Sequence, residues 1–220
     1  MRPFAPQLAR FTNRTTASSP IAQTAAGYFS SGYQSSPSPP RQNRMASTET
    51  GELKLETTDV KTAPGVDLSS EQRTLVASVL DLFAGRPSLA KLQLWKDDGE
   101  FSDPITMAKG RKQYEAQWYG LQTAFSEIER KSHNVTSAGN PISMDLTTRY
   151  KVKGVGKETT INSKINIFTD GGKIQRVEDK WDGKLPDSSI TNAFRRLNAV
   201  SVPKMVGVPN NAEEDAKRGN

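Results

Sequence analysis

Strict alternation of side chains over residues 142–152 is the feature that most limits what this chain can fold into. The residues predicted to face the interior are every second one: Ile142, Met144, Leu146, Thr148, Tyr150 and Val152. A period of two is typical of a β-strand with one buried face. Alternating runs at 161–167 and 173–181 follow, and Asp170-Gly171-Gly172 between them predicts a hairpin turn. The second half of the body is therefore predicted to be an antiparallel sheet.

The residues before this sheet have the spacing of helices instead. Asp67 or Ser69 can cap a first helix that ends near Gly85, and Pro87 can begin a short second helix over 87–94. A third helix is predicted after Gly110, with its apolar stripe at Tyr114, Trp118, Leu121 and Phe125. Between them we expect a turn at Asp98-Gly99 and a short strand at 100–103. A last helix is predicted at 187–198. Helices followed by strands indicate an α+β fold, with helices on one face of a sheet.

The N-terminal 48 residues have a composition unlike the rest of the chain. They contain no Asp, Glu or Lys, and they carry five arginines: Arg2, Arg10, Arg14, Arg41 and Arg44. An arginine-rich, serine-rich and acid-free N-terminus is typical of organelle transit peptides. Residues 4–14, wound as a helix, would place Phe4, Leu8 and Phe11 opposite three arginines. We expect import into mitochondria, most simply the matrix, through contacts of residues 1–30 with the import machinery. The alternative is a disordered basic tail that binds nucleic acid or acidic lipid.

Composition divides the remaining chain into a linker at 49–66, one domain at 67–200 and a tail at 201–220. A start at Met45 would give a cytosolic form without the leader. The net charge of +6 comes mostly from the leader, because the rest of the chain has 25 basic against 24 acidic residues. A near-neutral domain does not suggest a nucleic-acid-binding surface. No run of apolar residues is long enough for a membrane span.

Residue types also limit the chemistry. The chain has no cysteine and one histidine, His133, so neither a zinc site nor a thiol nucleophile is expected. The segment Gly154–Glu158 lacks the glycine spacing of a phosphate loop and is interpreted as a turn. We expect no cofactor and no metal.

Three motifs in sequence order resemble those of the SnoaL-like family in the nuclear-transport-factor-two-like (NTF2-like) superfamily. The first is Phe101-Ser102-Asp103-Pro104, similar to an F-x-D-P pattern. The second is the spacing of Gly110, Tyr114, Trp118 and Leu121 in the third helix. The third runs from Gly172-Lys173-Ile174 to Asp179-Lys180-Trp181-Asp182. The resemblance covers about residues 70–185. Fungal members of uncharacterised function, which share the first motif and a tail like Val202-Pro203-Lys204-Met205, are the most similar.

This resemblance implies a cone-shaped, cystatin-like or SnoaL-like fold. Three N-terminal helices would pack on a curved antiparallel sheet, with an added C-terminal helix. It also implies an apolar pocket inside the cone, where enzymes of the superfamily use carboxylates for isomerisation or cyclisation. Other members bind ligands or proteins, so the fold does not decide the function.

Asp179 is the leading candidate for a catalytic residue, because alternation places it on one strand face with Val177 and Trp181. Burial there would raise its pKa and suit proton transfer near neutral pH. Asp103 and His133 are further candidates. Asp103 could instead shape the turn before Pro104, and His133 could be structural. The expected pocket walls are Phe101, Tyr114, Trp118, Tyr150 and Trp181.

Three functions remain open from the sequence. The first is binding of a small apolar or amphipathic molecule, with catalysis unproven. The second is a cofactor-independent acid–base isomerase or cyclase. The third is a protein-interaction module with a packed cone. A cavity of about 300 Å³ or more would favour the first two. The polar outer face of the sheet predicts a monomer or weak homodimer.

Overall fold

The computed structural model describes residues 51–183, 191–192, 194 and 206–218. All of them belong to one compact unit, Arg41–Asn220. The predicted transit peptide lies outside the described residues. So does most of the predicted helix at 187–198, of which Thr191, Asn192 and Phe194 are described and helical.

The first two described helices begin at serine caps. Helix α2 spans Ser70–Phe83, and the Ser69 side chain accepts a hydrogen bond from the backbone of Gln72, whose side chain accepts one from the backbone of Ser69 in return. Helix α3 is shorter than predicted and spans Leu89–Leu92. It begins after Pro87 because the side chain of Ser88 caps it, through a hydrogen bond from Lys91 N (3.3 Å).

The first strand is longer than the sequence suggested. Strand β1 spans Trp95–Asp103 and pairs with β2, Thr106–Lys109, which was not predicted. The expected turn at Asp98-Gly99 is wrong, because both residues lie inside β1 at an irregularity in its pairing with the neighbouring strand. A Cβ on Gly99 would lie 2.9 Å from the Lys96 carbonyl oxygen, so the close backbone approach requires glycine.

Helix α4 spans Arg111–Ala124 and follows Gly110, whose φ of 83° favours glycine. Its stripe faces inward as predicted, with Tyr114, Trp118 and Leu121 buried. Phe125, the last residue of that stripe, begins the next strand instead of continuing the helix.

Four strands complete the sheet. They are β3 (Phe125–Ser137), β4 (Ile142–Val152), β5 (Glu158–Asp170) and β6 (Lys173–Trp181). The bounds of β4 and β6 are those predicted from alternation. The strand order is β2-β1-β6-β5-β4-β3. All neighbouring pairs are antiparallel except β1 and β6, which are parallel. The prediction of an entirely antiparallel sheet is therefore corrected at the pair that brings the two halves of the chain together.

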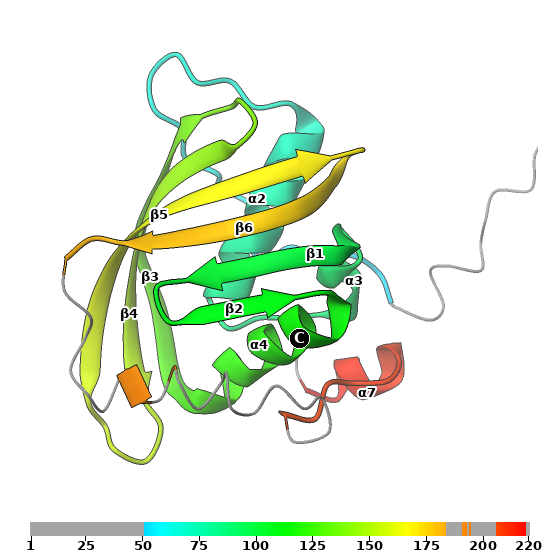
Figure 1. Ribbon diagram of the computed structural model, residues 1–220, viewed down its shortest axis with the longest axis vertical. Coiled ribbons are helices and arrows are strands. Elements are labelled where there is room, and N and C mark those ends of the chain that lie inside the picture. Colours follow the sequence, from blue (N-terminus) through cyan, green and yellow to red (C-terminus); the bar gives the residue numbers. More distant parts are fainter. Residues whose placement is uncertain (1–50, 184–190, 193, 195–205, 219–220) are drawn as a thin grey trace, which may run out of the picture. The chain divides into compact units, whose positions relative to one another are not determined.

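The fold is α+β, with a curved six-stranded sheet and helices on one of its faces. Figure 1 shows α2 behind the sheet and α4 beside β1 and β2. The enclosed side chains form one core that includes Trp95, Trp118, Tyr114 and Tyr119, all at most 1% exposed. No helix in the described part of the chain has the length and apolar character needed to cross a membrane.

Residues 56–63, which the sequence analysis assigned to a linker, pack on the domain. The buried Asp81 of α2 accepts hydrogen bonds from the backbone nitrogens of Glu56 (2.9 Å) and Thr57 (3.0 Å) and from the Thr57 hydroxyl (2.7 Å). Further along, the backbone of Lys61 and Ala63 pairs with Val135 at the edge of β3. The segment thus covers part of an otherwise unpaired strand edge.

The C-terminal residues 206–218 also contact the domain. Helix α7, Ala212–Ala216, carries Asp215, whose carboxylate accepts hydrogen bonds from Leu89 N and the Tyr119 hydroxyl, both at 2.7 Å. This buried carboxylate ties the end of the chain to α3 and α4.

Candidate functional site

Two carboxyl groups meet on neighbouring strands at the inner face of the sheet. In the parallel pairing of β1 with β6, Phe101 is opposite Val177 and Ser102 is opposite Glu178. Asp103 and Asp179 are the next residues along the two strands. Asp179 is only 7% exposed. The inner face predicted for Asp179 is therefore the observed one.

The environment of Asp179 favours its neutral form. Burial is the largest influence and raises the pKa of its carboxyl to about 7, with a further contribution from the charge of Asp103. The side chains of Ser163 and Trp181 favour the ionised form but do not offset burial. The Trp181 indole donates a hydrogen bond to Asp179 Oδ2 (2.8 Å).

The other carboxyl oxygen of Asp179, Oδ1, has no hydrogen bond in the described part of the chain like the one that Trp181 donates to Oδ2. Oδ1 is buried and has no partner at full hydrogen-bonding geometry among the described residues, although the Ser163 side chain is near enough to favour the ionised carboxyl. A buried acceptor left in this state costs about 1–3 kcal/mol. A water or ligand that donated to Oδ1 would remove that cost.

Asp103 has both roles that the sequence allowed for it. Its Oδ1 accepts a hydrogen bond from Ile105 N (2.8 Å), which shapes the turn between β1 and β2. Its carboxyl also lines the same interior cavity as Asp179. Burial raises the pKa of the Asp103 carboxyl, although its bonds to the turn partly oppose this.

The cavity beneath these carboxyls is small. Its volume is ≈ 20 Å³, enough for one water molecule, since about 10–15 Å³ is needed for one. Typical ligand pockets have about 300–1,000 Å³, so the interior of the cone is nearly filled, as the packed-cone alternative predicts. Its walls comprise Phe83, Phe101, Asp103, Gln117, Trp118, Leu121, Tyr150, Ile161, Asp179, Trp181 and Phe194.

An open groove lies on the other side of the carboxyl pair. It has a volume of ≈ 350 Å³, and its walls are Ser102, Asp103, Pro104, Glu178, Asp179, Lys180 and Trp181. Asp103, Asp179 and Trp181 line both the groove and the cavity. The two carboxyls therefore stand in a wall between a solvent-open space and the core.

Four of the five predicted pocket walls line the cavity: Phe101, Trp118, Tyr150 and Trp181. Tyr114 does not. Its ring packs at 5.0 Å from that of Trp95, and its hydroxyl donates to the Lys96 carbonyl (3.1 Å). It belongs to the core around Trp95, away from the carboxyl pair.

The structure does not bring His133 to the carboxyl pair. It lies on β3, where its Nε2 accepts a hydrogen bond from Lys61 N (3.0 Å). Burial, together with the charges of Arg130 and Lys61, lowers the pKa of His133, so it stays neutral. Its observed role is to hold the segment at 56–63.

Several wall residues were not predicted as a site. Gln117 was missed although it lies on α4 beside the predicted stripe, because polar residues next to a stripe usually face solvent. Phe194 comes from far along the chain and contacts Phe125, Tyr150 and Trp181 at ring distances of 5.0, 5.5 and 5.3 Å. No local sequence pattern could assign it to this cavity. Within the described residues, no cluster of three His, Asp or Glu side chains could hold a metal ion.

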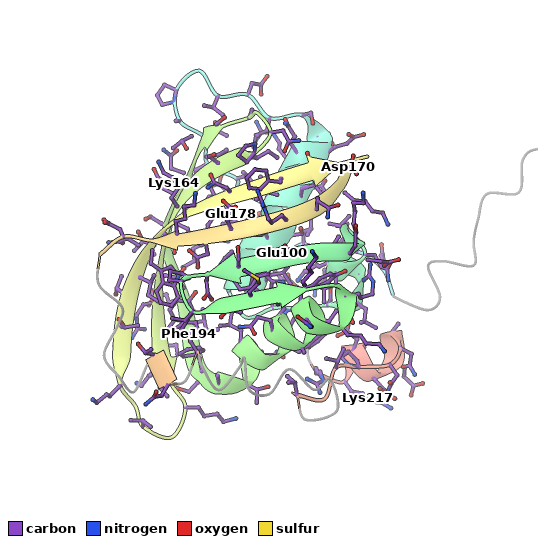
Figure 2. All side chains as sticks on the ribbon, in the orientation of Figure 1. Glu100, Lys164, Asp170, Glu178, Phe194 and Lys217 are labelled. Carbon is purple, nitrogen blue, oxygen red and sulfur yellow. The ribbon has the colours of Figure 1, made fainter. Side chains whose placement is uncertain are left out.

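The outer face of the sheet is polar and salt-bridged. Arg149 on β4 forms ion pairs with Glu129 (2.9 Å), Glu158 (2.8 Å) and Glu127. Figure 2 shows charged side chains along the strands, among them Glu100 on β1, Glu178 on β6 and Lys164 on β5. Glu178 pairs with Arg176 (3.3 Å) and Lys180 (3.4 Å), so several of the charges on this face are matched within the sheet.

Comparison with protein-family models finds no match, and comparison with curated proteins finds none either. Similar solved structures include a steroid delta-isomerase from Pseudomonas aeruginosa, at 16% identity and a TM-score of 0.47, covering 65% of this chain and 99% of that one. They also include a putative SnoaL-like polyketide cyclase from Jannaschia sp. CCS1, at 16% identity and a TM-score of 0.44, covering 60% and 98%.

A third similar structure is a protein with a cystatin-like fold from Silicibacter pomeroyi DSS-3, at 19% identity and a TM-score of 0.43, covering 59% of this chain and 86% of that one. At such low identities and TM-scores, these structures do not indicate what this chain binds or does.

Proposed function

We propose that this protein binds a small, partly apolar molecule at the Asp103–Asp179 pair, from the groove side. The observation that carries the proposal is the buried Asp179 Oδ1, which has no partner at full hydrogen-bonding geometry among the described residues. Native proteins leave few buried polar atoms in this state, and those that remain often mark a ligand or water position. A ligand that donates a hydrogen bond to Oδ1 gains binding free energy, because it removes the cost of leaving that buried oxygen unpaired.

The two spaces beside the carboxyl pair set the shape of the ligand. The interior holds one water-sized group, whereas the groove of ≈ 350 Å³ holds a small organic body. Trp181 and Pro104 offer apolar surface in the groove. A polar head inside and an apolar body in the groove fit these dimensions. A packed-cone interaction module would not require two carboxyls at the cavity.

The second candidate function is cofactor-independent acid–base catalysis, as in an isomerase or cyclase. It is favoured by the pKa of Asp179, about 7, which allows the carboxyl both to take and to return a proton near neutral pH. In such a reaction Asp179 would remove a proton from carbon beside a carbonyl group and return it to another atom. The substrate oxygen would need a donor at the same time.

We also propose that the protein acts in mitochondria. This rests on the acid-free leader with Arg10 and Arg14 on one helical face. A leaderless form from Met45 would act in the cytosol.

The chain offers its own reporters for ligand binding, because it has three tryptophans. Trp118 and Trp181 line the cavity, and Trp95 does not. In ¹H–¹⁵N spectra, a screen of small molecules should contain binders that shift the indole signals of Trp118 and Trp181 and leave that of Trp95 in place. A screen in which no molecule moves the two cavity signals would contradict the proposal.

Asp179→Asn separates binding from catalysis. A catalytic role predicts that the variant keeps binding a substrate found in this way but loses turnover by a factor of about 10²–10⁴. Unchanged turnover in the folded variant would eliminate Asp179 as the acid or base and leave binding alone.

A further inference from the structure

We propose that the head group held between Asp103 and Asp179 is a primary ammonium, so that the ligand is a small organic amine whose body lies in the groove. This inference rests on the proposed binding function and names its ligand class. Three properties of the site carry it: the charge of the walls, the size of the cavity and the nature of the surrounding rings.

The described walls of the cavity carry acidic side chains but no basic ones. Asp103 and Asp179 both face the cavity, and none of the described residues that line it is Lys, Arg or His. The groove contains Lys180, but that side chain is 66% exposed and lies 3.4 Å from Glu178. A buried and a half-buried carboxyl without a cation resist ionisation, and a cation between them removes the repulsion and offsets the desolvation cost.

The cavity admits a head group of one size. At ≈ 20 Å³ it accepts one water-sized group. A primary –NH₃⁺ is about as large as water, whereas a trimethylammonium or a guanidinium is several times larger. The body of the amine would remain in the groove beside Pro104 and Trp181.

The other walls are suited to a cation as well. Aromatic rings surround the carboxyl pair: Phe101, Trp118, Tyr150, Trp181 and Phe194. A cation within about 6 Å of an aromatic face is attracted by the ring's electrons, most strongly where water is excluded. The ammonium also has three N–H donors. One of them can satisfy Asp179 Oδ1, which is buried without a partner at full hydrogen-bonding geometry among the described residues.

The pH dependence of binding distinguishes an amine from a neutral ligand. Asp103 on β1 and Tyr150 on β4 are the titratable cavity residues that interact with Asp179, and burial raises the pKa of Tyr150 so that it stays neutral. Helix α4 contributes the uncharged Gln117 and Trp118 to the walls. An ammonium needs ionised Asp179, so its affinity should rise with pH. A neutral ligand that accepts a hydrogen bond needs the protonated carboxyl of Asp179, so its affinity should fall as pH rises.

The experiment compares three probes that share a phenylethyl body and differ in the head group: 2-phenylethylamine, its neutral isostere 2-phenylethanol, and the N,N,N-trimethyl derivative of the amine. Binding is followed by the indole signals of Trp118 and Trp181 at pH 6 and pH 8. We expect the primary amine to bind about tenfold more tightly at pH 8, because the ionised fraction of a group with a pKa near 7 rises by that factor. We expect the trimethyl derivative to leave the signals unmoved.

Asp179→Asn should weaken amine binding at pH 8 by at least about tenfold, because it removes the charge partner. Asp145→Asn, on the exposed outer part of β4, is the matched control and should not. If 2-phenylethanol binds as tightly as the amine, or amine affinity is independent of pH, the ammonium inference is overturned and the proposed binding function survives. If no probe moves the cavity signals at millimolar concentration while other small molecules do, the inference also fails. If nothing at all moves them, both proposals fail.

Discussion

Asp103 and Asp179 lie side by side on two parallel strands, one position beyond the register pair of Ser102 with Glu178. The chain reaches this arrangement from two segments that are far apart in the sequence. Burial raises the pKa of both carboxyls, and both stand in the wall between the groove and the core. The parallel pairing of β1 with β6 is therefore the structural relationship on which the proposed site depends.

Asp179 should make stability depend on pH. The ordinary pKa of an aspartate carboxyl is 3.8 and that of Asp179 in the folded protein is about 7, so the folded state retains a proton that the unfolded state releases. The stabilisation from this proton is complete below about pH 4 and is lost as pH rises through about 7. It is worth on the order of 4 kcal/mol, because each pKa unit corresponds to about 1.4 kcal/mol.

Asp179→Asn removes this titration. In urea unfolding, the free energy of unfolding of wild type minus that of the variant should therefore fall by roughly 4 kcal/mol between pH 4 and pH 8. Asp145→Asn is the control for the loss of one carboxyl on the exposed face. A difference between wild type and Asp179→Asn that is the same at both pH values would contradict the buried, protonated state of Asp179.

Trp118 should be one of the costliest residues to truncate. It is 1% exposed and contacts the rings of Phe83, Phe101 and Trp95. Trp118→Ala should lower the free energy of unfolding by about 3–5 kcal/mol. Trp118→Phe keeps part of the ring volume and removes an indole Nε1 that has no partner among the described residues, so it should cost less. A loss below about 1 kcal/mol for the alanine variant would be inconsistent with core packing.

Asp81 should anchor the segment at 56–63. It is fully buried, accepts three hydrogen bonds from Glu56 and Thr57, and lies 3.4 Å from the buried Lys91. Asp81→Ala leaves these donors unpaired and should cost about 3–5 kcal/mol. Trypsin should then cleave sooner at Lys54 and Lys61.

The control for this anchor is Asp67→Ala. Asp67 is 98% exposed at its side chain and 3.6 Å from Arg73, so it should change stability by less than about 1 kcal/mol. Equal trypsin sensitivity in wild type and Asp81→Ala would show that Asp81 does not hold the segment.

The protein should be a monomer or a weak dimer. The outer face of the sheet is polar and holds Arg149 paired to three glutamates, whereas stable dimers bury a larger apolar patch. Sedimentation velocity of the full chain should give a species near 24.1 kDa at low concentration. A dimer that persists at nanomolar concentration would refute this expectation.

Import should depend on the leader arginines. Changing Arg10 and Arg14 to Glu reverses the charge of the predicted amphipathic helix and should move a fluorescent fusion out of mitochondria. Changing the same two residues to Lys keeps the charge and should preserve import. Mitochondrial fluorescence of the glutamate variant, or its absence in wild type, would disprove the targeting proposal.

Local patterns predicted much of the fold. Alternation gave the bounds of β4 and β6, and Ser69, Gly85 and Gly110 marked where helices begin or end. The same patterns failed at β1 and β2. Asp98-Gly99 has the composition of a turn, yet pairing with β6 draws it into a strand, because a neighbouring strand outweighs local preference.

Only part of the candidate site could be predicted, because local patterns show which way a side chain faces but not which distant segment it meets. Asp179 and the walls on α4 and β6 could be identified because a residue's face follows from its position in a strand or helix. Gln117 and Phe194 could not, since a polar side chain and a distant segment carry no local sign of sharing a cavity. For His133 the sequence left a catalytic and a structural role open, and its contact with the segment at 56–63 could be seen only in the structure.

By itself, the sequence determined which residues face inward and where most elements begin and end, because periodicity and caps act over a few residues. Only the tertiary structure decided that β1 lies parallel to β6, that Asp103 therefore joins Asp179, and that side chains fill the cone down to ≈ 20 Å³. These features depend on contacts between distant segments. Their burial, rather than any local pattern, sets the pKa of Asp179 and the size of the group that can reach it.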